Sequence, residues 1–158
     1  MAQAYLAGTD DIIAMIKVMI NDPRSWTLTQ KKLKRPDEYV LSTIRMLIPS
    51  NRSLKKKEKK QIYGNLTVMG QKLFHAPSPQ GWSDMAEEWL SGESMLRRLR
   101  FAELVAAQYV SDHPDIVALA EQHLGPSLTD KTRLMIQRAP SRKTALALLL
   151  SAPEFQRR

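Results

Sequence analysis

The side chains through which this sequence could carry out acid–base or metal chemistry are few. The three histidines, His75, His113 and His123, fall on separate predicted elements, and none has a second histidine three or four residues away. That spacing argues against a zinc site. The chain contains no cysteine, which excludes disulfides, thiolate metal sites and cysteine nucleophiles. We therefore expect neither a metal ion nor a cofactor.

Acidic residues cluster at only one place that could serve catalysis. Glu87, Glu88 and Glu93 are close together in the sequence, and a pair of carboxylates can act as general acid and base. Acidic residues near a helix start are also typical of a solvated surface. The sequence has no Gly-rich phosphate loop, no His-Glu-x-x-His, no Gly-x-Ser-x-Gly and no EF-hand loop. It therefore assigns no catalytic residue.

One enzymatic alternative stays open. This chain could be a fragment of an enzyme whose site is completed by an N-terminal part outside the sequence. The polar candidates for such a shared site are Arg45, His75, Glu88 and Arg97. The hypothesis requires these four side chains to converge in one cleft.

The stretch from Leu73 to Ala106 organises the rest of the chain. Its Pro-x-Pro-x-Gly sequence at 77–81 excludes a helix there. A helix beginning near Trp82, with Ser83 as N-cap, would place Trp82 and Trp89 on one side. We expect this bend to insert the Trp82 indole into a helical bundle.

A binding groove is the alternative role for this stretch. One tryptophan would form a wall of the groove, and Arg97 or Arg98 would be the charged contact. Arg45 lies beside an apolar helix stripe, where its stem can pack while its head reaches a carboxylate. The candidate binding residues are His75, Trp82, Trp89, Arg97, Arg98 and Arg45.

The positive charge of the chain is a local feature. Residues 51–60 hold six basic residues and one acidic residue, and so supply +5 of the net charge of +8. A polyanion could bind the lysines of this exposed basic segment, which are Lys55, Lys56, Lys57, Lys59 and Lys60. No aromatic residue or arginine is interleaved with these lysines, which argues against nucleic acid as the partner. A charge run is also typical of a solvated surface.

Helical patterns extend over the whole sequence. N-caps, prolines and apolar stripes predict helices at about 9–20, 36–48, 53–73, 83–90 and 93–110, and at about 114–124, 129–139 and 141–152. In the helix at 36–48, the apolar stripe of Val40, Leu41, Ile44, Leu47 and Ile48 should be buried. No segment alternates like a half-buried strand. We predict an all-α, single-domain bundle of about seven to nine helices over residues 1–158.

Neither a membrane span nor a signal peptide is visible in the sequence. No run approaches the length of eighteen apolar residues that a membrane helix needs. The first residues, MAQAYLAGTDD, lack a basic region followed by an apolar stretch. The compartment cannot be assigned from these features.

Four stretches together resemble a bacterial family called domain of unknown function eighteen hundred. They are GTDDIIAMIKVMINDP, KLKRPDEYVLSTIRML, KLFHAPSPQGW with the later WLSGESMLRRLRFA, and ALALLLSAPEFQRR. They occur in the order of the family and cover nearly the whole chain. The matching positions are Lys34, Pro36, Glu38, Arg45, Pro77, Gly81, Trp82, Trp89, Leu90, Pro153, Glu154 and Phe155. The lysine run does not belong to the family pattern.

The resemblance implies an α-helical protein whose relatives are much longer, so that this chain corresponds to their C-terminal part. It also implies a bacterial protein that is exported or periplasmic when complete, and it carries over no catalytic residue. Our leading hypothesis is a non-enzymatic interaction or structural module. Its partner would be another protein or the missing N-terminal part.

Overall fold

Helices make up the regular structure of this computed structural model, which describes residues 12–26 and 32–158. The α-helices are α2 (Ile12–Asn21), α3 (Pro36–Leu47), α4 (Lys56–Val68), α5 (Gly92–Tyr109), α6 (Ile116–Leu124), α7 (Asp130–Gln137), α8 (Arg142–Ser151) and α9 (Pro153–Gln156). The 3-10 helices are η1 (Pro23–Trp26), η2 (Ala86–Glu88), η3 (Val110–Asp112) and η4 (Gly125–Ser127). Within the described residues there is no strand beyond an isolated antiparallel bridge of Leu33 with Arg157. The predicted all-α class is confirmed.

Short sequence signals fix most helix starts. Pro36 occupies the first turn of α3, where its missing N–H is not needed. The side chains of Ser91, Thr129 and Ser141 each accept a backbone N–H at the start of α5, α7 and α8. Asp115 caps α6 in the same way. These local bonds set where each helix begins, and packing then decides which face is buried.

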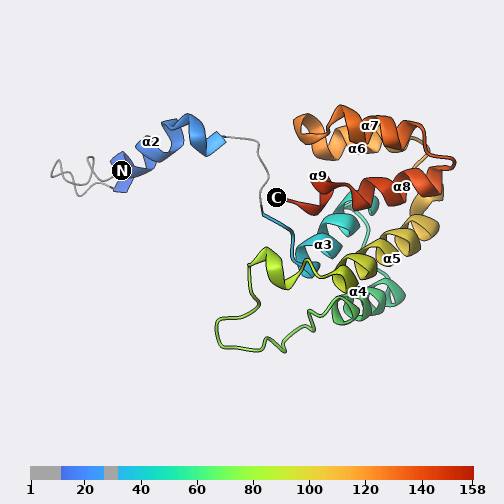
Figure 1. Ribbon diagram of the computed structural model, residues 1–158, viewed down its shortest axis with the longest axis horizontal. Helices are drawn as coiled ribbons and strands as arrows, with labels where there is room; N and C mark the ends of the chain where they lie inside the picture. The colour runs from blue at the N-terminus through green and yellow to red at the C-terminus, as the bar shows by residue number, and fades with distance from the viewer. Residues whose placement is uncertain (1–11, 27–31) are drawn as a thin grey trace.

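The core forms around α5 and α8, which pack along each other. In the view of Figure 1, α5 lies between α4 and α8. α7 also packs on α8, and α3 packs on α4. Leu146, Leu149 and Leu150 of α8 have no exposed surface, as expected for a segment that is apolar nearly all round.

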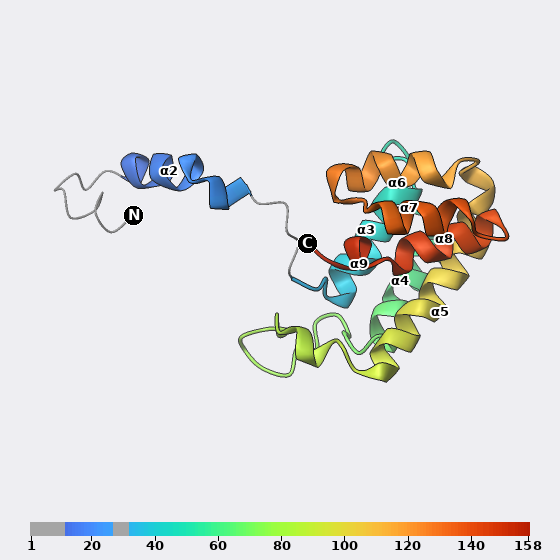
Figure 2. The same ribbon diagram turned by 45° about the horizontal axis from the view of Figure 1, so that its top comes forward.

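Helix α2, the first helix of the described residues, lies apart from the bundle formed by α3 to α9 (Figures 1 and 2). None of its residues is buried, and its apolar side chains, such as Ile12 and Ile13, are largely exposed. The predicted N-cap Thr9 lies outside the described residues. No helix of the described chain is long and apolar enough to span a bilayer.

Two helix predictions were wrong in detail. Leu41 is exposed, and α3 instead buries Tyr39, Thr43 and Met46 together with Val40 and Leu47. The helix predicted at 83–90 is only the single 3-10 turn η2. Helical spacing alone thus determined neither the buried face of α3 nor the length of the element at 83–90.

Candidate functional site

The loop between α4 and α5 leaves the bundle at a precise chain reversal. The backbone N–H of Gln71 donates to the carbonyl of Leu66 at 2.9 Å, and that of Gly70 donates to Thr67 at 3.0 Å. Gly70 has a φ of 90°, so the two hydrogen bonds complete a Schellman ending, which favours glycine. The loop 70–91 then projects from the bundle (Figure 1).

Both ends of this loop are anchored to the start of α3. The buried side chain of Gln71 accepts a hydrogen bond from the backbone N–H of Asp37 at 2.7 Å. That bond satisfies a free donor in the first turn of α3. Near the other end, Asp84 accepts a hydrogen bond from the Lys32 ammonium at 2.5 Å and lies 3.6 Å from Arg35. The loop is therefore held at two points.

The two tryptophans form a small cluster of their own beside the main core. Trp89 is buried, and its indole N–H donates to the carbonyl of Ser83 at 2.9 Å. Trp82 is half-buried, and its ring lies 6.0 Å from that of Trp89 at an interplanar angle of 55°. Trp82 thus packs on Trp89 and not on the main core, contrary to the expected insertion of its indole.

Phe74 is the most unusual residue of the loop. Its side chain is 97% exposed, and its φ of 60° places the backbone in the left-handed region. Among the residues that the structure describes, it is the one non-glycine residue with a positive φ. A left-handed conformation costs an L-residue roughly 1–2 kcal/mol. Met85 and Leu90 of the same loop are also largely exposed.

The predicted binding residues occupy different environments. His75 is exposed, with its Nδ1 2.8 Å from the carbonyl of Leu73. Arg97 is half-buried, donates to the carbonyl of Val68 at 2.5 Å and pairs with Glu93. Arg45 is exposed on α3. The tryptophans and Arg97 lie on or beside the loop, whereas Arg45 belongs to another element.

Arg98 is enclosed by the protein. Only 2% of the residue is exposed. Its guanidinium donates to the Gln156 side-chain oxygen and to the Lys34 carbonyl, both at 2.7 Å. It also lies 5.2 Å from the ring centroid of Tyr39. Arg98 therefore joins three parts of the chain inside the fold.

The four polar candidates of the enzymatic alternative are not joined to one another. In the described chain, no hydrogen bond or ion pair connects any two of Arg45, His75, Glu88 and Arg97. The described residues also contain no group of three or more His, Asp or Glu side chains placed to hold a metal ion. The shared-site hypothesis stays a prediction.

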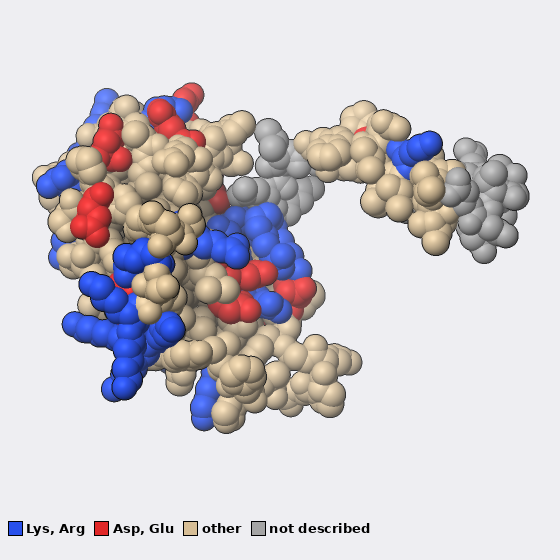
Figure 3. Space-filling view, turned by 180° about the vertical axis from the view of Figure 1, so that it is seen from behind, with Lys and Arg blue, Asp and Glu red and all other residues tan. Residues whose placement is uncertain are grey.

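The lysine run is displayed on the surface of the molecule. All five of its lysines are exposed, and basic side chains gather densely on the face seen from behind (Figure 3). The one acidic residue among them, Glu58, points inward and is buried. Polyanion binding by this segment stays a prediction.

Glu58 is a buried, hydrogen-bonded carboxylate that the sequence analysis did not single out. Its carboxylate accepts hydrogen bonds from Arg52 at 2.8 and 3.0 Å, from the Lys55 backbone N–H at 2.7 Å and from the Tyr109 hydroxyl at 3.0 Å. The Arg52 bonds are the main cause that lowers the pKa of Glu58 to about 2. Burial raises the pKa of Tyr109 to about 12. Glu58 is the third residue of α4, the position at which a glutamate accepts a hydrogen bond from the N-cap backbone in a capping box. That signal could have identified Glu58 from the sequence.

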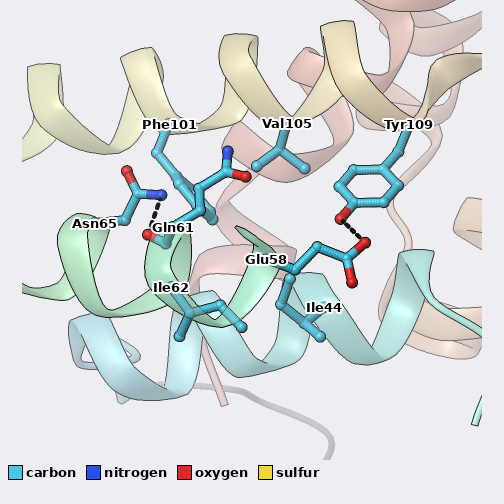
Figure 4. A pocket seen from close by; sticks show the side chains of 8 residues that line it. All are labelled: Ile44, Glu58, Gln61, Ile62, Asn65, Phe101, Val105 and Tyr109. Atoms are coloured by element: carbon cyan, nitrogen blue, oxygen red, sulfur yellow. Dashed lines mark hydrogen bonds between the residues drawn. The ribbon is translucent and has the colours of Figure 1, made fainter. Parts of the chain in front are cut away.

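The cavity beside Glu58 is too small for a ligand. It lies where α3, α4 and α5 meet, between side chains such as Ile44, Ile62 and Phe101 (Figure 4). Its volume is about 10 Å³, at the lower limit for one water molecule. The carboxylate, arginine and tyrosine therefore form a structural cluster that ties α4 to α5.

The Trp89 hydrogen bond should hold the loop in its shape. We expect Trp89→Phe, which keeps an aromatic ring but loses the indole N–H, to lower the free energy of unfolding by about 1 kcal/mol. Amide hydrogen exchange of residues 82–90 should become faster. Trp82→Phe is the matched control, because no hydrogen bond of the Trp82 indole is present in the described structure. Equal exchange rates in both variants would contradict this role.

Comparison with known proteins identifies a family. No curated protein matches the chain, and no solved structure matches it. A family model described as "Protein of unknown function (DUF1800)" matches residues 1–157. That match extends over nearly the whole chain and confirms the resemblance found in the sequence. The protein therefore belongs to the DUF1800 family.

Proposed function

We propose that this protein is a non-enzymatic interaction module that binds another protein through the loop 70–91, with Phe74 as the anchor. The partner is a separate protein or the N-terminal part of the longer, exported bacterial relatives that the family resemblance implies. The contact on the partner is an apolar pocket that accepts an aromatic ring. Aromatic anchors in such pockets dominate the energy of many protein interfaces.

The single observation that carries this proposal is the conformation of Phe74. An aromatic ring that is 97% exposed gains nothing from packing within this chain, yet its backbone has a φ of 60°. Backbone strain that the local structure enforces is found most often at functional sites. Burial of the ring against a partner would offset both the strain and the exposure.

The anchoring of the loop supports the same role. Gln71 and Asp84 fix the loop to the start of α3, and Trp89 holds its second half. A loop held in this way loses little conformational entropy when a partner binds. The apolar side chains of Met85 and Leu90 add exposed surface to the same loop.

Site-specific photo-crosslinking tests the proposal in cells that contain the native partner. A photoreactive phenylalanine analogue at position 74 should yield one specific crosslinked protein. The same analogue at Leu134, an exposed apolar position on α7, is the control. If position 74 gives no product beyond that of position 134, the loop is not the binding surface.

Replacing Phe74 by glycine should separate binding from folding. Glycine adopts a φ of 60° without strain, so the free energy of unfolding of Phe74→Gly should stay the same or rise by up to about 1 kcal/mol. Its affinity for the crosslinked partner should fall at least about 30-fold, as for the loss of an interface anchor. Calorimetric titration of the purified partner and urea unfolding measure the two effects.

Two further variants control this result. Phe74→Tyr keeps the ring and should keep binding, and Leu104→Ala removes an exposed leucine of α5 and should not change it. A partner that binds Phe74→Gly as tightly as the wild type would refute the role of Phe74.

A further inference from the structure

A groove with a volume of about 310 Å³ lies on the bundle, apart from the loop 70–91. It is formed by the segment before α3, by α3 itself, by the end of α6 and by the C-terminal residues. The polar and charged side chains that line it include Lys34, Ser42, His123, Arg157 and Arg158. Its volume is at the lower end of the range for small-molecule sites, which is roughly 300–1,000 Å³.

Both backbone polar groups of Lys34, its N–H and its carbonyl, are hydrogen-bonded. Its N–H donates to the carbonyl of Gln156 at 2.8 Å, and its carbonyl accepts from the buried Arg98 guanidinium at 2.7 Å. The Lys34 ammonium lies 4.5 Å from the centroid of the Phe155 ring. Phe155 is buried in the core and has an edge contact with Tyr39. The ammonium is therefore held in place before any ligand arrives.

Three residues of the groove have polar side chains that lack a hydrogen-bond partner within the described chain. In the part of the chain that the structure describes, Lys34, Ser42 and His123 make no side-chain hydrogen bond and no ion pair. They come from three separate segments, yet all line the same groove. Burial lowers the pKa of Lys34 and the pKa of His123. The nearby His113 lowers the pKa of His123 further. Lys34 and Ser42 are half-buried, whereas His123 is exposed. Half-buried polar groups without hydrogen-bond partners are costly, and a ligand would satisfy those of Lys34 and Ser42.

The charge of the groove favours an anion. Arg157 and Arg158 line it together with Lys34. The carboxylate of Glu154, which also lines it, accepts hydrogen bonds from the hydroxyls of Thr129 at 2.5 Å and Thr132 at 2.9 Å. Arg158 pairs with Glu38 at 2.8 Å and lies 3.8 Å from Asp84, and neither of these carboxylates lines the groove. Three basic residues and one acidic residue thus line the groove, and the acidic one is already hydrogen-bonded.

We propose that this groove is a binding site for the carboxylate or phosphate group of a small acidic ligand. The Lys34 ammonium and the two guanidiniums compensate its charge, and the Ser42 hydroxyl and the His123 ring N–H donate hydrogen bonds to its oxygens. No residue of the loop 70–91 lines the groove, and the site does not depend on the function proposed for that loop.

Titration with two simple anions tests the site. The backbone amide and histidine ring resonances of the protein are followed by NMR as sodium phosphate or sodium acetate is added, with ionic strength held constant by sodium chloride. We expect saturable shifts at Ser42, His123 and Arg157 with at least one anion. The anion that binds more tightly identifies the group that the site prefers.

Substitution of Lys34 shows whether the response is specific. Lys34→Met keeps an unbranched side chain against Phe155 and should weaken binding at least about tenfold, the effect of losing a charge-assisted hydrogen bond. Lys34→Arg should retain binding. Lys143→Met, at an exposed lysine of α8 outside the groove, is the matched control and should bind like the wild type.

Other outcomes would overturn the proposal. No saturable shift with either anion would do so, as would equal weakening by Lys34→Met and Lys143→Met. If Lys34→Met does not fold, Ser42→Ala provides the test, with an expected weakening of about threefold to tenfold. Unchanged binding in Ser42→Ala would then contradict the site.

Discussion

Arg98→Ala should destabilise the protein by about 3–5 kcal/mol, the largest effect that we expect from a single substitution. Loss of the guanidinium removes two hydrogen bonds and leaves the Lys34 carbonyl and the Gln156 side-chain oxygen without their donor. Bonds to a charged group contribute about 1.5–3 kcal/mol each, and a buried acceptor without a partner carries a further cost. The lost contact with Tyr39 leaves a cavity in the core.

Urea unfolding followed by circular dichroism measures this effect. Arg98→Met restores much of the volume but not the hydrogen bonds, so it should lie between the wild type and Arg98→Ala. The matched control is Arg100→Ala, an exposed arginine of the same helix, which should change the free energy of unfolding by less than about 0.5 kcal/mol. If Arg98→Ala is as stable as Arg100→Ala, the buried guanidinium does not hold the segments together.

Glu58→Gln should lower the free energy of unfolding by about 2 kcal/mol at neutral pH. Glutamine keeps the size of the side chain, but its NH₂ group would face hydrogen-bond donors. Arg52, the Lys55 backbone N–H and the Tyr109 hydroxyl all donate to the carboxylate. The lowering of the Glu58 pKa to about 2 corresponds by itself to a larger loss of the free energy of unfolding. Solvent screens the interaction because the partner Arg52 is partly exposed, so the expected loss is smaller.

The same carboxylate should make stability depend on pH. Because the folded state lowers the pKa of Glu58 from 4.5 to about 2, its contribution is complete above about pH 4.5 and is lost as the pH falls towards 2. The difference in free energy of unfolding between the wild type and Glu58→Gln should therefore shrink over this range. Urea unfolding at a series of pH values measures it.

An exposed glutamate on α5 provides the control for this pH dependence. Glu103→Gln should have nearly the same pH profile of stability as the wild type, because Glu103 is exposed and has no ion pair in the described structure. If Glu58→Gln also follows the wild-type profile between pH 4.5 and 2, the hydrogen bonds do not stabilise its ionised form.

The sequence by itself determined the helical class and several helix boundaries. Pro36, Thr129 and Ser141 act on backbone groups within a few residues of themselves, so their effect can be predicted without the rest of the fold. The segment 145–152, ALALLLSA, is apolar nearly all round, and a helix without a polar face is typical of a buried position. The family was also recognised from short stretches, and the family match over residues 1–157 confirms it.

Only the tertiary structure decided which side chains meet. The Arg98 side chain contacts Gln156, and that of Gln71 caps a helix that begins at Pro36. These bonds join segments that are far apart in the sequence. Whether a polar side chain is exposed or buried depends on the surface that packs against it, which no local pattern specifies. For the same reason the sequence showed an exposed lysine run but not the buried carboxylate of Glu58 inside it.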